Sequence, residues 1–213
     1  MIVLTTTSTT TSSSTSTGTL QRTAKIERTT KETSVTVDVN IDGFGKTNVK
    51  TSLPFIDHLV ASIGKHSMMD INLTAKSNDG VLHHLIEDIS ITLSQTIDKA
   101  LSSRSQINRF GYAMVPMDEA LAYVSIDLVK RQFCNIQLKL IRDSVEGIAR
   151  EDLEHFVMSF VQNLNACTHI IIEYGDNDHH KIECAIKAFA ISLRMAASID
   201  KKMKGAPSTK GMM

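Results

Sequence analysis

Apolar residues recur with two different spacings along the chain, and segments of the two kinds alternate. Between Thr33 and Ile41 every second residue is apolar, which is the period of a half-buried β-strand. Between His84 and Leu101 they recur every three or four positions, as on one face of an amphipathic helix. The same patterns return further along. They predict strands over 33–41, 70–75, 121–129, 133–140 and 168–174, and helices over 53–63, 84–101, 151–164 and 180–197.

The order of these segments predicts an internal duplication. Each half, near 21–108 and 109–205, is expected to contain strand, strand, helix, strand and helix. One sheet per half, with helices on one face, is an α+β fold. Residues 1–20 are a Thr/Ser tract with too few apolar residues for a core, so a disordered extension is expected there and a folded domain over 21–213.

Composition argues against several classes of protein. Lys plus Arg and Asp plus Glu each total 23, so the charge balance indicates no nucleic-acid partner. No apolar run reaches the ~18 residues of a membrane span, so no membrane association is expected. The three cysteines are widely spaced, which favours a reducing compartment, the cytoplasm, over a disulfide framework. The chain has neither a GxGxxG nor a P-loop pattern, so nucleotide binding loses support.

A short motif, HHxxE, occurs once in each half. HHLIED begins at His83 and HHKIEC begins at His179. Imidazole and carboxylate are ligands of borderline transition metals. On a helix, positions three and four apart share a face, whereas neighbours point about 100° apart. Each glutamate can therefore share an ion with one histidine of its pair, and the other histidine is free to serve a second ion. A lone pair would more often be a surface accident, but two copies at the same offset indicate a dinuclear metal site.

Two further histidines are the best candidates to complete the coordination. His58 lies in LPFIDHL, and His169 lies in the strand before the second motif. His155 matches His58 by repeat position, but its helix is densely apolar, so it is predicted to be a hydrogen-bonded core or interface histidine. Six histidines and two glutamates divide into three and one per ion, with open positions for substrate or water. The predicted ligands are His58, His83, His84, Glu87, His169, His179, His180 and Glu183.

These motifs, with several others, resemble those of the imidazoleglycerol-phosphate dehydratase family. The match runs from about Arg28 to Gly211 and includes RTTKET, LPFIDHL, both HHxxE motifs, INRFG, PMDEAL, DLVKR, GDNDHHKIE and PSTKG. The resemblance implies two similar α+β halves, a ribosomal protein S5 domain 2-like fold. It implies dehydration of D-erythro-imidazoleglycerol phosphate to imidazoleacetol phosphate in L-histidine biosynthesis. It also implies two Mn²⁺ ions per active site and a homo-oligomer, a 24-mer built from trimers, with sites between subunits.

The resemblance also implies roles for residues outside the metal set. Two ions on the ring nitrogens of the substrate would act as Lewis acids and as a template. Glu32 is the expected proton shuttle. His66 matches a histidine near the substrate, and Asp118 matches a carboxylate that either takes part in catalysis or, with Glu119, orients metal-bound histidines. The expected phosphate-binding residues are Arg109, Arg131, Lys187, Ser208 and Lys210.

Several positions depart from the family pattern, although no predicted ligand is lost. Ser52 stands where the family has glycine, and Ser94 replaces a helix glycine. Val81-Leu82 replaces the acidic residues that lead into the first motif, so a supporting carboxylate is expected to be missing there. Val129-Lys130 replaces Ser-Gly before a phosphate-binding arginine, which weakens the case for that contact.

Two other functions fit the metal ligands. One is a non-catalytic metal-binding shell of the same fold, but storage has no use for the phosphate-binding set. The other is a dinuclear metallohydrolase, but such sites usually need bridging carboxylates and only two of the eight predicted ligands are carboxylates. The sequence therefore favours the dehydratase.

Overall fold

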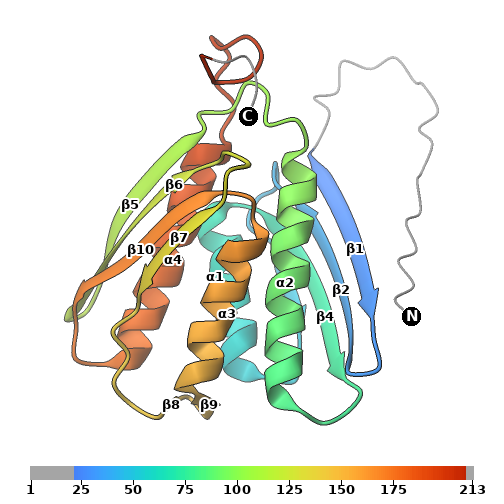
Figure 1. The fold of residues 1–213 in the computed structure, drawn as a ribbon, viewed down its shortest axis with the longest axis vertical. Helices are drawn as coiled ribbons and strands as arrows, with labels where there is room; N and C mark the ends of the chain where they lie inside the picture. Colours follow the sequence, from blue (N-terminus) through green and yellow to red (C-terminus); the bar gives the residue numbers. More distant parts are fainter. Residues whose placement is uncertain (1–21, 210–213) are drawn as a thin grey trace.

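The computed structural model describes residues 22–209. Two four-stranded sheets form the outer layers of the molecule, and four helices lie between them (Figure 1). The predicted Thr/Ser extension lies outside the described residues. Among those described, no helix is long and apolar enough to cross a membrane.

The two halves share one topology, which confirms the predicted α+β duplication. The first sheet has the order β1-β2-β4-β3 and the second β5-β6-β10-β7. In each sheet the last-named strand runs parallel to its neighbour and the other pairs are antiparallel. The first half comprises β1 (Thr23–Thr29), β2 (Thr33–Asn40), β3 (Thr47–Lys50), α1 (Pro54–Ser67), β4 (Asp70–Ser77) and α2 (Leu82–Leu101). The second comprises β5 (Phe110–Met117), β6 (Ala120–Asp127), β7 (Phe133–Gln137), the hairpin β8 (Ser144–Val145) and β9 (Ile148–Ala149), α3 (Arg150–Asn163), β10 (Cys167–Tyr174) and α4 (Asp178–Ala197).

The helices of one half pack against helices of the other. In the helical layer α1 packs on α4 and α2 packs on α3, while α2 also covers the first sheet and α4 the second. Alternate strand residues such as Val37 and Val124 are buried and join one core that spans both halves. Gly111 allows the close approach of β5 to α4, because a Cβ there would overlap the carbonyl oxygen of Ser192. Each helix pair therefore brings together side chains from both copies of the repeat.

The strand prediction missed the outer strands. β1 and β3 are mostly exposed, so their apolar alternation is weak. β5 carries exposed Phe110, Tyr112 and Met114 on its outer side, which hides the inward–outward period. The second sheet therefore presents large apolar side chains to its outer face.

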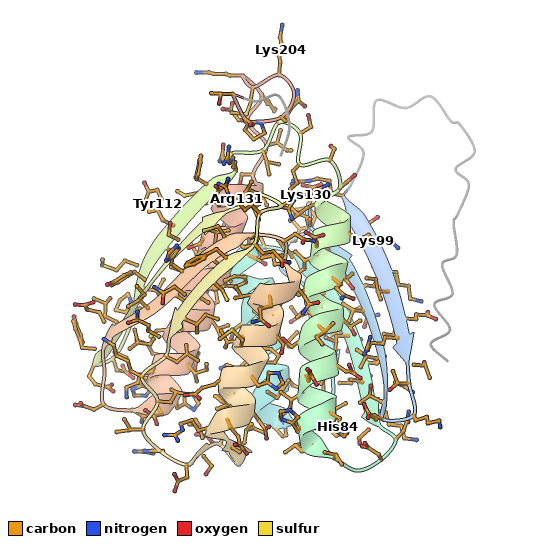
Figure 2. The ribbon with its side chains drawn as sticks, in the orientation of Figure 1. His84, Lys99, Tyr112, Lys130, Arg131 and Lys204 are labelled. Carbon is orange, nitrogen blue, oxygen red and sulfur yellow. The ribbon has the colours of Figure 1, made fainter. Side chains whose placement is uncertain are left out.

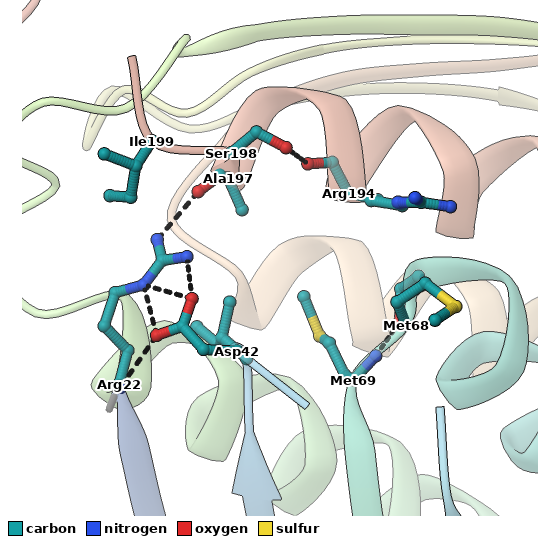
Figure 3. Close-up of a pocket in the computed structure, with 10 residues that line it drawn as sticks. Arg22, Asp42, Met68, Met69, Arg194, Ala197, Ser198 and Ile199 are labelled. Carbon is teal, nitrogen blue, oxygen red and sulfur yellow. Dashed lines mark hydrogen bonds and ion pairs between the residues drawn. The ribbon is translucent and has the colours of Figure 1, made fainter. Parts of the chain in front are cut away.

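A cavity of about 270 Å³ lies where the end of α4 meets the first half (Figure 3). Arg22 spans its edge. The guanidinium pairs with both carboxylate oxygens of Asp42 and donates to the carbonyl oxygen of Ala197 at 2.7 Å. This contact fastens the start of β1 to the C-terminal end of α4.

Candidate metal centre

Both pairs of adjacent histidines lie in the first turn of a long helix. His83 and His84 open α2, and His179 and His180 open α4. Asn177 caps α4 by accepting from the backbone N–H of His179 at 2.9 Å. The helical rise then places a glutamate one turn along from each pair.

The first cluster joins α2 to α3. His83, Glu87 and His155 each offer a ligand atom, and these atoms lie within 4.8 Å of one another. Nδ1 of His155 lies 3.1 Å from Nε2 of His83, and Nε2 of His155 lies 3.5 Å from Glu87. The two rings stack with centroids 4.7 Å apart. The packed helices α2 and α3 therefore bring together three side chains that could bind a metal ion.

The second cluster joins α1 to α4 in the same way. His58, His179 and Glu183 offer ligand atoms within 4.8 Å of one another. Oε2 of Glu183 lies 3.2 Å from Nε2 of His58 and 3.0 Å from Nε2 of His179. Phe55, from α1, packs on the His179 ring with centroids 5.1 Å apart. Both copies of the motif therefore meet a histidine that comes from the other half.

A carboxylate faces the Nδ1 atom of every histidine in the two pairs. An imidazole that donates its Nδ1–H to a carboxylate keeps the Nε2 lone pair for a metal, and its orientation is fixed. The contacts of all four rings are compatible with this tautomer. The contacts are His83 with Asp152 at 2.7 Å, His84 with Asp79 at 2.7 Å, His179 with Glu146 at 3.0 Å, and His180 with Glu119 at 2.6 Å.

Charge around the second cluster keeps its carboxylates ionised. Burial would raise the pKa of Glu183, but Lys187 at 2.8 Å and His58 hold it at about 2. The hydrogen bond from His180 holds the pKa of Glu119 at about 2. Burial and the nearby Lys187 lower the pKa of His66. An ionised carboxylate is the form that binds a metal.

Two other predicted carboxylates lie beside the paired histidines. Glu32 forms a group with Asp79 and His84 whose ligand atoms lie within 4.8 Å of one another. Oδ2 of Asp118 lies 3.4 Å from Nε2 of His180. Each HH pair thus has an additional acidic group close to its second histidine.

Comparison with known proteins shows the family of this chain. A family model described as imidazoleglycerol-phosphate dehydratase matches residues 51–193. The dehydratase of Prosthecochloris aestuarii is 40% identical over 193 residues, which cover 90% of this chain and 96% of that protein. That of Marinobacter nauticus is 40% identical over 195 residues, or 91% and 99% of the two chains. The chain belongs to the imidazoleglycerol-phosphate dehydratase family. It is a hydro-lyase that acts on imidazoleglycerol phosphate in histidine biosynthesis.

Solved structures of the family have the same fold. The Pyrococcus furiosus dehydratase, solved in complex with (S)-C348, has a TM-score of 0.75 and 34% identity, covering 88% of this chain and all of that one. The Staphylococcus aureus dehydratase has a TM-score of 0.75 and 28% identity, covering 84% and 99%. The resemblance inferred from the motifs is therefore confirmed for fold, family and reaction.

The two clusters bear on two of the sequence-based assignments in this dehydratase. His155, predicted to be a hydrogen-bonded core or interface histidine, does contact His83 across the α2–α3 interface, and it is also a member of the first cluster with a side chain 34% exposed. His169 lies on β10 beside Phe133 and Cys167 and belongs to neither cluster among the described residues. The repeat contained a sequence signal for His155 as a ligand, because His155 occupies the position in the second half that His58 occupies in the first.

The predicted phosphate-binding residues divide into two groups. Lys187 lies on α4 beside Glu183 in the second cluster. Arg109 pairs with Asp127 through two nitrogens at 2.6 and 2.9 Å and donates to the carbonyl oxygen of Pro207. Ser208 follows that proline, and Lys210 lies outside the described residues. Figure 2 shows Arg131 at the end of the molecule opposite His84. Within one chain, Arg131 and His84 therefore do not meet.

Two of the departures from the family sequence pattern, at residues 81–82 and at residue 52, can be examined in the structure. The first HH pair does not lack carboxylate support, contrary to expectation, because Asp79 and Asp152 provide it. Ser52 has a positive φ of 66°, a conformation that suits glycine better than serine. The Val81-Leu82 departure is therefore compensated, whereas Ser52 carries backbone strain.

Proposed function

We propose that each cluster holds one Mn²⁺ ion, so that two ions serve each active site. The observation that carries this proposal is that a carboxylate meets the Nδ1 atom of every histidine in the two HH motifs, so that Nε2 is the nitrogen that would bind a metal. Imidazole nitrogens and carboxylate oxygens suit manganese. The proposed ligands are His58, His83, His84, Glu87, His155, His179, His180 and Glu183, with His155 in place of His169.

The active site is proposed to form between chains. Each cluster supplies two histidines and one glutamate, which leaves His84 and His180 to complete the coordination of a neighbour's cluster. The separation of Arg131 from His84 in Figure 2 supports the same conclusion, because one substrate must reach both groups. The apolar outer side of β5, with Phe110 and Tyr112, provides a surface for contact between copies. We therefore propose a homo-oligomer, the 24-mer built from trimers.

The side chains of this dehydratase have separate tasks. When bound, the two ions supply Lewis acidity and a template for the imidazole ring of the substrate. Glu32, beside His84, takes up and returns the proton at its carboxylate. His66 and Asp118 lie near the reacting part of the substrate, next to Lys187 and His180 respectively. Arg109, Arg131, Lys187, Ser208 and Lys210 bind the phosphate.

The three free cysteines support a reducing location, proposed to be the cytoplasm. Cys134, Cys167 and Cys184 form no disulfide. Burial raises the pKa of Cys184 to about 11, so this thiol is unreactive.

The experiment that tests the proposal combines metal analysis with turnover. The purified chain is stripped of metal, reloaded with Mn²⁺ and mixed with imidazoleglycerol phosphate, and the enol/ketone product is followed by absorbance. Activity that returns at two Mn²⁺ per chain is the expected result. Full activity without metal, or no turnover with both ions bound, would contradict it. His84→Ala is expected to lose both activity and metal, and a fully active His84→Ala chain would overturn the ligand assignment.

A further inference from the structure

His83 is supported from across the helix interface. Asp152 lies in the first turn of α3, 69 residues along the chain, and its Oδ1 atom is 2.7 Å from Nδ1 of His83. Its side chain is only 10% exposed. A hydrogen bond to a largely buried carboxylate is strong, because little water competes for either group.

We propose that Asp152 is a positioning residue for the His83 cluster. The carboxylate of Asp152 fixes the Nδ1–H tautomer of His83 and orients Nε2 toward the ion. It also makes Nε2 more basic and therefore a stronger metal ligand. The inference rests on the proposed function, since it requires that the cluster binds metal. It adds a residue outside the ligand set that sets the affinity of one ion position.

The local sequence explains why this support must come from α3. The first turn of α2 contains no acidic residue, and Val81-Leu82 precedes the histidines. Asp79, the nearest carboxylate before the helix, is already bonded to His84. Asp152 faces the remaining Nδ1 because α3 packs along α2.

The corresponding histidine of the other half is held differently. His179 has the ring of Phe55 against it, and its Nδ1 atom meets Glu146 from the β8–β9 turn. The side chain of Glu146 is 56% exposed, in contrast to that of Asp152. The two ion positions therefore have matching ligands but unequal support, and removing Asp152 should affect only one of them.

The test measures Mn²⁺ binding rather than turnover. The metal-stripped full chain is titrated with Mn²⁺, and the free ion is followed by electron paramagnetic resonance. Asp152→Asn is expected to weaken one of the two Mn²⁺ positions by about 10- to 100-fold and leave the other unchanged. Glu151→Gln is the matched control, because it removes the same charge from the same turn of α3 at an exposed position.

A second variant separates positioning from folding. Asp152→Glu keeps the charge and displaces the carboxylate by one methylene, so a smaller loss of affinity than with Asn is expected. If both variants bind two Mn²⁺ ions with the affinity of the parent, whatever their melting temperatures, the positioning role is overturned. If the parent chain itself binds no Mn²⁺, the failure lies in the proposed function, and the positioning role falls with it.

Discussion

The imidazole rings of His83 and His155 stack across the α2–α3 interface, with Nδ1 of His155 3.1 Å from Nε2 of His83. The Nδ1 atom of His83 is already bonded to Asp152, so its Nε2 atom carries the free lone pair. Nε2 of His155 lies 3.5 Å from Glu87, and all three residues offer ligand atoms within 4.8 Å of one another. In each packed pair, the helix without the motif contributes one of the three residues of the cluster.

We therefore predict that His155→Ala removes a metal ligand. The variant should lose about one Mn²⁺ per chain and most of its activity, because the cluster retains only His83 and Glu87 from its own chain. The matched variant is His169→Ala, whose side chain lies on β10 away from both clusters. Metal content measured by atomic absorption checks the prediction. Normal content in His155→Ala together with loss in His169→Ala would reverse the assignment.

Arg131 provides a test of phosphate binding that is independent of metal. Loss of one charge-assisted contact to a phosphate costs about 1.5–3 kcal/mol, so Arg131→Ala should lower kcat/KM by roughly 10- to 100-fold. Mn²⁺ content should not change, because Arg131 belongs to the proposed phosphate-binding residues and is not one of the proposed metal ligands. Lys130→Ala is the control for a simple loss of surface charge. Equal effects of the two substitutions in steady-state kinetics would argue against a specific contact.

The sequence predicted the inner elements of the fold because burial imposes a period. Alternating residues such as Val35 and Val37 point into the core, and the apolar stripe of α2 faces the first sheet. The pattern missed β1, β3 and β5. In each of these strands the inward-facing and outward-facing positions do not differ clearly in polarity. In β5 the large side chain of Tyr112 is exposed, so the outward-facing positions of this strand are not polar.

The candidate site was predictable where residues are close in the sequence. His83 and Glu87 share a helix face, so their spacing alone placed them together. The contact of His83 with Asp152 joins residues 69 positions apart and depends on how α2 packs on α3. An apolar helix pattern predicts that a helix is buried, but it does not identify the partner helix. The apolar pattern of α3 therefore gave no reason to count His155 among the ligands.

The ion pair of Arg22 with Asp42 should make stability depend on pH in acid. The hydrogen bonds from Arg22 lower the pKa of Asp42 from its ordinary value of 3.8. A carboxyl group with a lowered pKa in the folded state stabilises the protein above its unfolded pKa, and this stabilisation is lost as pH falls through the folded pKa. Asp42→Asn should therefore cost about 1 kcal/mol near pH 7, since the pair is partly exposed.

Melting curves of the parent chain and Asp42→Asn between pH 8 and pH 3 test this directly. The difference in melting temperature should stay constant at neutral pH and close as pH falls below about 4. Asp38→Asn, which also changes an aspartate of the first half, is the control for general charge effects. A difference that persists unchanged at the acid end would show that Asp42 acts through packing instead of its charge.

Ser52 lies just before α1 with a φ of +66°, and relieving this conformation should stabilise the protein. A residue with a Cβ pays about 1–2 kcal/mol in the left-handed region, whereas glycine adds roughly 0.5–1 kcal/mol of entropy to the unfolded chain. Ser52→Gly should therefore raise the free energy of unfolding by about 0.5 kcal/mol. Metal content should not change, because α1 and His58 keep their positions. Gly80→Ser is the reciprocal variant, since Gly80 has a φ of +82° and open space around it, and it should lower stability. Denaturant titrations of both variants measure the two effects, and a destabilised Ser52→Gly chain would mean that the serine side chain contributes more than the strain costs.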